Sequence, residues 1–89
     1  MTKRPTIIYL IRHGEVHNPK GILYGRLPGF RLSDTGRQQA RMAGRYLDGR
    51  VDALFSSPLL RARQTAQEIQ SVGWAPPTTI DASYSPCLP

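Results

Sequence analysis

The apolar positions at the start of the chain form an unbroken run. Residues 6–11 read TIIYLI, a β-branched and aromatic segment without polar alternation after its first residue. Such a run is typical of a central strand covered on both faces. Residues 14–32 contain four glycines and two prolines and have no regular period, which predicts a long loop. Loops of more than about 12–15 residues inside a compact domain are often functional.

Helical spacing of small and apolar residues begins after this loop. Ser33 and Asp34 have the pattern of an N-cap and a first-turn acid, so a helix is predicted from Asp34 to about Asp48, and Gly49 ends it. The predicted inner face of this helix carries Gly36, Ala40, Ala43, Gly44 and Leu47. Another face, expected to be solvated, carries Arg37, Arg41 and Arg45.

A second strand and helix follow in the same order. Residues 52–55 (DALF) predict a short strand, and Ser57 caps a helix predicted from Pro58 to about Val72. Its predicted inner face carries Leu59, Ala62, Ala66 and Ile69. Residues 78–80 are a candidate third strand. Alternating strands and helices predict an α/β fold, with a parallel central sheet between helices in a three-layer αβα arrangement. Tyr9 and Phe55 are expected in its core.

The excess of basic side chains indicates an anionic partner. Twelve Lys and Arg stand against six Asp and Glu, for a net charge of +6, and ten of the twelve are arginines. Arginine favours bidentate recognition of phosphate or carboxylate. The stripe of Arg37, Arg41 and Arg45 has no aromatic residues interleaved with it, and the chain has no base-reading motif, so a phosphorylated small molecule is favoured over nucleic acid.

The sequence gives little support for a membrane-spanning segment or a metal site. No apolar run approaches the roughly 20 residues that span a bilayer, so we expect a cytoplasmic protein. One cysteine, Cys87, and two histidines give no recognisable metal-binding spacing, and no metal or other cofactor is expected.

Two arginines are predicted to meet at the carboxyl edge of the sheet. Arg12 directly follows the first strand, and Arg61 lies in the first turn of the second helix. If the two strands are neighbours, both guanidinium groups reach one point, where helix N–H groups near Ser57 add positive charge. Such a site suits a phosphate dianion. His13 would attack phosphorus there, provided that a backbone carbonyl near Gly14 fixes its tautomer.

Three segments together carry a family resemblance. They are RHGE at 12–15, LSDTGRQQA at 32–40 and SSPLLRARQTA at 56–66. In this order they resemble the RHG, LS..G..QA and SxLxRAxxTA motifs of the histidine phosphatase superfamily, which includes the cofactor-dependent phosphoglycerate mutases. The resemblance covers about residues 6–72.

The resemblance implies roles for individual residues. It implies that His13 accepts the phosphoryl group and that Arg12 and Arg61 bind it. Asn18 is similar to an asparagine that contacts phosphate shortly after the RHGE motif, and Arg26 lies in a loop where the family places substrate contacts. Gly14 is expected to let the backbone turn sharply beside the reacting atom.

The family's later motifs have no counterpart here. They supply an acid that protonates the leaving group and a second histidine, whereas no histidine follows His17 and the only carboxylate after residue 72 is Asp81. We therefore expect residues 1–73 to be the N-terminal half of a truncated domain and residues 74–89 to be an irregular, divergent tail. His17 is expected in an exposed loop, and Glu15 is expected to pair with an arginine rather than to replace the acid.

These patterns predict a phosphomonoester hydrolase that acts through a phosphohistidine, with impaired activity in this short chain. A phosphatase is favoured over a mutase because the loop between residues 21 and 31 does not closely match the mutase form. Two alternatives remain open. One is a non-catalytic module that binds phosphate or nucleic acid, and the other is an inactive gene fragment.

Overall fold

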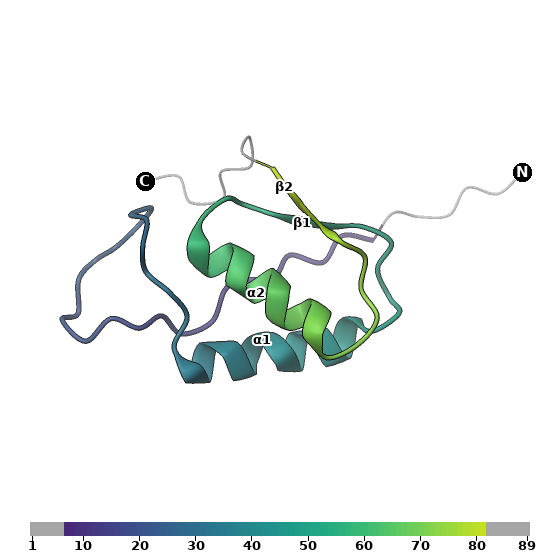
Figure 1. Cartoon of the computed structure of the whole chain (residues 1–89), viewed down its shortest axis with the longest axis horizontal. Coiled ribbons are helices and arrows are strands. Elements are labelled where there is room, and N and C mark those ends of the chain that lie inside the picture. Colours follow the sequence, from purple (N-terminus) through teal and green to yellow (C-terminus); the bar gives the residue numbers. More distant parts are fainter. Residues whose placement is uncertain (1–6, 82–89) are drawn as a thin grey trace, which may run out of the picture.

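The computed structural model describes residues 7–81, so Cys87 lies outside the described residues. Its elements are α1 (Asp34–Leu47), β1 (Leu54–Ser56), α2 (Leu60–Ser71) and β2 (Thr78–Ile80). The two strands pair in parallel, with Leu54 beside Thr78 and Ser56 beside Ile80. Figure 1 shows α2 between α1 and the two strands. Parallel strands joined through a packed helix confirm the α/β fold class and the candidate third strand.

Helix α1 begins and ends almost where the sequence predicts. The Ser33 hydroxyl accepts a hydrogen bond from the Gly36 amide at 3.1 Å, which satisfies a donor that the first turn leaves unpaired. Gly49 follows the helix with a φ of +69°, a conformation that glycine adopts without strain. The buried positions are Gly36, Ala40, Gly44 and Leu47, which is most of the predicted inner face.

The core forms where α1 crosses α2. A Cβ atom on Gly44 would lie 2.8 Å from the Cα of Ile69 and 2.9 Å from its carbonyl oxygen. Only a residue without a side chain allows the two backbones to approach so closely. Leu47 and Ile69 are each 2% exposed at this crossing, with Ala40 and Ala66 also buried beside them. Small residues on α1 therefore determine how near the helices lie.

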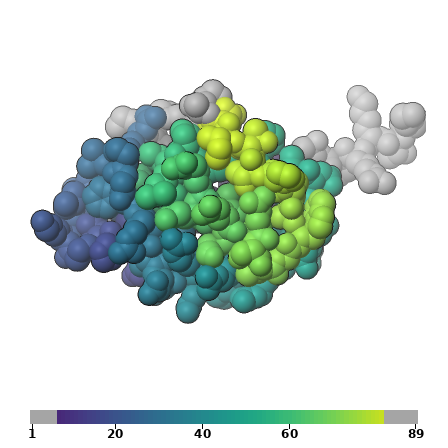
Figure 2. Space-filling model, viewed as in Figure 1, coloured from purple at the N-terminus to yellow at the C-terminus, as the bar shows by residue number. Residues whose placement is uncertain are grey.

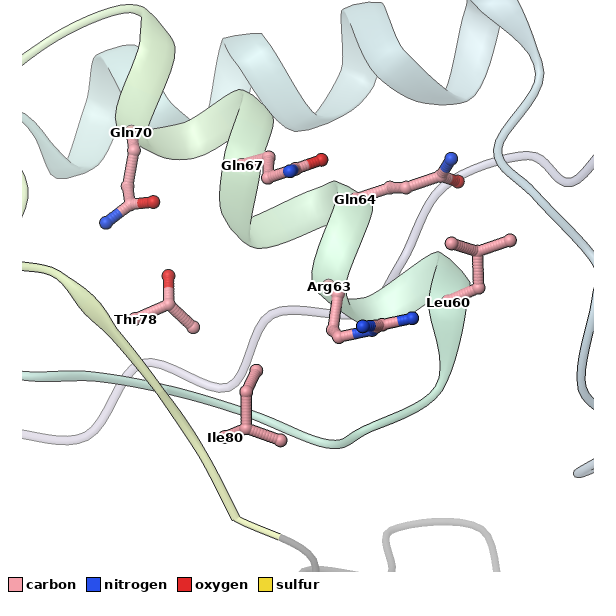
Figure 3. A pocket seen from close by; sticks show the side chains of 7 residues that line it. All are labelled: Leu60, Arg63, Gln64, Gln67, Gln70, Thr78 and Ile80. Carbon is pink, nitrogen blue, oxygen red and sulfur yellow. The ribbon is translucent and has the colours of Figure 1, made fainter.

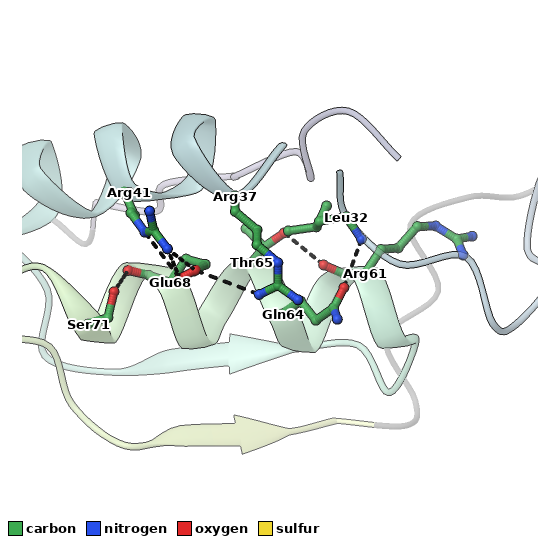
Figure 4. A network of polar contacts seen from close by, with 8 residues as sticks. All are labelled: Leu32, Arg37, Arg41, Arg61, Gln64, Thr65, Glu68 and Ser71. Atoms are coloured by element: carbon green, nitrogen blue, oxygen red, sulfur yellow. Dashed lines mark hydrogen bonds and ion pairs between the residues drawn. The ribbon is translucent and has the colours of Figure 1, made fainter. Parts of the chain in front are cut away.

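An ion-pair cluster joins the same two helices, as Figure 4 shows. Arg41 donates from Nε and Nη2 to the two carboxylate oxygens of Glu68 at 3.2 and 3.3 Å. Arg37 Nη1 lies 3.8 Å from the same carboxylate. The prediction of a fully solvated arginine face is therefore wrong for these two residues. Glu68 is buried on α2, and a buried carboxylate requires positive partners.

The predicted central strand at 6–11 is not formed in its described part. Residues 7–11 take part in no strand pairing, and Ile7, Ile8 and Leu10 are 70–80% exposed. The ring of Tyr9 packs edge-on against Tyr46, near the end of α1. A central strand needs a hydrogen-bonded neighbour and a covered face, and within residues 7–81 the two short strands pair with each other. Tyr9 places part of the apolar run beside the end of α1 instead.

Two smaller predictions around β1 also need correction. Helix α2 begins at Leu60, two residues later than predicted, because the Ser57 hydroxyl accepts the Leu59 amide at 3.2 Å and holds a turn there instead. Phe55, expected in the core, is 65% exposed, and Tyr9 is only half-buried. Phe55 lies in β1, where its side chain is uncovered by other described residues, whereas Tyr9 lies outside the sheet and contacts Tyr46.

Candidate functional site

The RHGE segment, residues 12–15, lies directly on the first turn of α1. A Cβ on Gly36 would overlap the carbonyl oxygen of Glu15, and a Cβ on Gly14 would lie 3.0 Å from the Gly36 Cα. The Glu15 amide donates to Gln39 Oε1 at 2.9 Å, and its carbonyl accepts from the Ser33 amide at 3.0 Å. Two glycines thus allow one backbone to rest on the other, and hydrogen bonds fix the contact.

The reason for a glycine at position 14 differs from the prediction. Gly14 does not adopt a positive φ, so no left-handed turn requires it. It is required instead because its Cα faces α1, where Gln39 and Gly36 leave no room for a side chain. Gln39 was not predicted as a functional residue, although its place in the LSDTGRQQA segment was a usable signal.

His13, the second residue of the RHGE segment, is half-buried. Its Nδ1 lies 2.9 Å from the carbonyl oxygen of Gly14. A carbonyl oxygen only accepts hydrogen bonds, so in the neutral ring Nδ1 carries the proton and Nε2 keeps its lone pair. This is the tautomer expected for a histidine that attacks phosphorus, and its carbonyl partner is where the sequence placed it.

Arg61 lies in the first turn of α2 and is only 1% exposed. Its Nη1 donates to the carbonyl of Leu27 at 2.9 Å, and its Nη2 donates to the carbonyl of Gly25 at 2.6 Å. Its Nε is buried and has no hydrogen-bond partner among the described residues. The predicted phosphate ligand is therefore directed into the long loop, which covers it.

We call this segment the 17–31 loop; it forms the purple and dark blue end of the molecule in Figure 2. Its two ends meet where Val16 pairs with Leu32 in an antiparallel bridge and the His17 amide donates to Arg31 at 2.8 Å. Gln64 of α2 accepts the Leu32 amide at 2.8 Å. Helix α2 therefore contacts the 17–31 loop in two places. Gln64 binds Leu32, where the two ends of the loop meet, and Arg61 binds the turn in its middle.

Tyr24 connects His13 and Arg61, two of the three predicted catalytic residues. Its ring centroid lies 6.3 Å from that of His13, and the Arg61 guanidinium carbon lies 4.8 Å from the same centroid. Phe30 stacks on Tyr24 at 5.1 Å. A guanidinium over an aromatic face is attracted by the ring quadrupole. Tyr24 lies two residues before Arg26, in the loop expected to contact substrate, but its bridging position was not predicted.

The remaining predicted site residues do not converge on this point. Arg12 and Arg26 are exposed, and neither has a hydrogen bond or an ion pair with another described residue. The Asn18 side chain exchanges two hydrogen bonds with the backbone of Ile22, at 2.7 and 3.0 Å, and so shapes its own turn. Out of the predicted set, the structure thus brings together His13 with its partner Gly14 and, through Tyr24, Arg61.

Glu15 and His17 lie near His13 in the sequence, and their contacts show what each one does. Glu15 accepts a hydrogen bond from the Ser33 hydroxyl at 2.6 Å and forms no ion pair with a described arginine, so the predicted arginine partner is wrong. Ser33 is the nearer partner because it caps α1 directly beneath the RHGE segment. His17 is exposed, as predicted.

One groove of the described surface lies away from these residues. Figure 3 shows a shallow groove of about 370 Å³ between α2 and β2, lined by five side chains of α2 and by Thr78 and Ile80. It contains none of the predicted site residues and has glutamines as its main polar groups. The groove therefore supplies no second catalytic constellation.

Comparison with known proteins identifies the family. The family model of the histidine phosphatase superfamily (branch 1) matches residues 8–82. The chain belongs to the histidine phosphatase superfamily. The match extends past residue 73 and includes β2, whereas the domain boundary placed there stays a prediction.

Individual relatives support the same family. An uncharacterized protein of Mycobacterium tuberculosis is 55% identical over 65 residues, which are 72% of this chain and 32% of that protein. Fructose-2,6-bisphosphatase TIGAR B of Danio rerio is 48% identical, over 67% of this chain and 24% of its own length. Putative phosphoserine phosphatase 2 of Hydrogenobacter thermophilus is 42% identical, over 73% of this chain and 32% of its own length. The chain spans about a third or less of these relatives.

A solved structure supports the fold. The protein histidine phosphatase SixA, complexed with tungstate, superimposes with a TM-score of 0.66 at 23% identity, over 86% of this chain and 49% of that chain. At this identity the likeness shows the fold alone, and it confirms a partial α/β domain of the histidine phosphatase type.

Two further observations bear on possible partners. Neither α1 nor α2 has the length and apolar character to cross a bilayer, and these are the helices of the described residues. Within residues 7–81, no three side chains of His, Cys, Asp or Glu gather closely enough to hold a metal ion.

Proposed function

We propose that this histidine phosphatase chain carries the nucleophile half of a phosphomonoester hydrolase that acts on phosphorylated small molecules. His13 is the phosphoryl acceptor, and Arg12 and Arg61 bind the transferring group. Asn18, Arg26 and Gly14 belong to the substrate side of the same site. The observation that carries the proposal is the bond between His13 Nδ1 and the Gly14 carbonyl, which leaves Nε2 as the nucleophile.

The chemistry follows from this tautomer. Nε2 forms a bond to phosphorus while the bond from phosphorus to the ester oxygen breaks, and the leaving oxygen takes a proton from an acid. Water then hydrolyses the N–P bond and releases phosphate. Guanidinium groups stabilise the charge on the phosphoryl oxygens during both steps. We expect slow hydrolysis by the 89-residue chain itself, because a general acid contributes about 10²–10⁴-fold and no residue of this chain matches the family's acid.

The test compares His13→Ala with His17→Ala in hydrolysis of p-nitrophenyl phosphate. His17 is a matched control, because it is an exposed histidine four residues away whose recorded contact is through its backbone amide. We expect turnover by the wild-type chain and by His17→Ala, and its loss in His13→Ala. Acid-labile label from a radioactive phosphomonoester should appear on the same two proteins only.

Other outcomes separate the alternatives. Equal rates in all three proteins would refute a nucleophilic role for His13. Phosphate binding without turnover or label in any protein would support a non-catalytic phosphate-binding module. A chain that shows no cooperative melting, with or without phosphate, would support an inactive fragment.

A further inference from the structure

The Arg61 guanidinium cannot meet a phosphate in the conformation described above. The side chain is 1% exposed, and both of its terminal nitrogens donate to carbonyl oxygens of the 17–31 loop. A phosphate dianion binds arginine best through two parallel N–H groups of one edge. Nε is buried without a partner, but the Nη2 beside it is occupied by Gly25. The loop must therefore move before Arg61 can bind an anion.

We propose that the 17–31 loop is a latch on Arg61 that an anion at the phosphoryl site displaces. The latch consists of the Tyr24 ring and the carbonyls of Gly25 and Leu27, which hold the guanidinium when no anion is present. The inference rests on the proposed phosphate-binding role of Arg61. It adds that phosphate and the loop compete for the same donors, so binding of one releases the other.

The 17–31 loop can open at a low cost in free energy, and its closed form makes specific contacts. Gly25 has a φ of +49° and Gly29 a φ of +87°, so both turns use the left-handed conformations that glycine tolerates. Leu27 donates its amide to Tyr24 at 2.7 Å, which sets the carbonyls of the turn. Other hydrogen bonds of the loop, between His17 and Arg31, Gly21 and Asn18, and Asn18 and Ile22, stay within the loop. The contacts with Arg61 therefore join the interior of the loop to α2.

Competition between phosphate and the loop for Arg61 predicts an effect that a purely structural role of Tyr24 would not produce. If Tyr24 holds the closed state, its removal increases the population in which Arg61 is available, and the apparent Kd for phosphate falls in proportion. A cation–π contact of this kind changes an equilibrium by about three- to tenfold. Tyr24→Ala should therefore bind inorganic phosphate several times more tightly than wild type, whereas Tyr24→Phe, which keeps the ring, should match wild type.

The experiment combines calorimetry with hydrogen exchange on the full chain. Inorganic phosphate is titrated into wild type, Tyr24→Ala and Tyr24→Phe, with sodium chloride at matched ionic strength as the control. Amide exchange of residues 22–31 is measured with and without phosphate. In wild type we expect phosphate to accelerate this exchange about threefold or more. Arg61→Lys should exchange quickly without phosphate and show no further response, while Arg63→Lys, an exposed neighbour on α2, should behave as wild type.

The outcomes distinguish this inference from the proposed function. Phosphate binding with unchanged loop exchange, or Tyr24→Ala binding phosphate no more tightly than wild type, overturns the latch. No phosphate binding by wild type overturns both proposals. A responsive loop in a chain that forms no phosphohistidine overturns the hydrolase and leaves the latch intact. His13→Ala should keep the loop response, because displacement requires anion binding at Arg61 and not phosphoryl transfer.

Discussion

Gly36→Ala tests the contact on which the position of His13 depends. A Cβ at residue 36 would overlap the Glu15 carbonyl oxygen and lie 3.0 Å from the Glu15 carbon and nitrogen. Backbone atoms cannot rotate out of the way, so the RHGE segment must shift, and overpacking of this kind costs about 1–3 kcal/mol. Alanine regains at most about 1 kcal/mol of helix propensity. We therefore expect the free energy of unfolding to fall by about 1–2 kcal/mol, and Tm by about 4–8 °C for each kcal/mol.

Gly44→Ala is the matched control for this experiment. It makes the same substitution in the same helix. The new Cβ would lie 2.8 Å from the Cα of Ile69, and the nearest neighbours of this Cβ do not include the RHGE segment. Thermal melting followed by circular dichroism should show a loss of stability in both variants. Titration with phosphate below the melting range should show weaker binding only in Gly36→Ala. A Gly36→Ala protein that melts at or above the wild-type temperature would refute the overlap, and equal phosphate affinities in the two variants would refute its role in the site.

Two further predictions concern the packing of α1. Glu68→Gln removes the charge that Arg37 and Arg41 share. Because these arginines are partly exposed, we expect a loss of only about 1 kcal/mol in urea unfolding. The difference should shrink in about 1 M sodium chloride, and a loss independent of salt would contradict an electrostatic origin. Ser33→Ala removes the cap of α1 and should lower the free energy of unfolding by about 1 kcal/mol, against little change for Ser71→Ala. Equal stability of Ser33→Ala and wild type would show that the cap contributes nothing.

The features that sequence predicted well are those with local causes. Helix α1 has its cap, its small inner face and its terminal glycine within one segment, so its bounds could be read directly. The bond from His13 to the Gly14 carbonyl joins adjacent residues and was predicted for the same reason. The body of helix α2 was predicted well, but its start was predicted two residues too early. The Ser57 hydroxyl, expected to cap the helix, accepts the Leu59 amide in a turn that precedes it.

The features that sequence did not predict depend on contacts between distant segments. Arg37 and Arg41 have helical spacing that is equally compatible with water and with Glu68, which lies 27 residues beyond Arg41. Arg61 meets loop carbonyls 34 and 36 residues away, and nothing in its own helix indicates their position. The apolar run at 7–11 encodes a preference for a covered strand, but the presence of neighbouring strands is not a property of that run.

The 17–31 loop contributes to the spacing of the candidate site, together with the packing of α1 on α2. In a continuous parallel sheet, strand register would fix the distance between groups at the carboxyl edge. Here residues 7–11 pair with no described strand, so no ladder relates His13 to Arg61. His13 is positioned by the contact of its segment with α1, and Arg61 by its place on α2 and by the loop. Among the described residues, Tyr24 has ring contacts with both. A change in the loop should therefore alter the geometry between nucleophile and phosphate ligand even where the two helices stay packed.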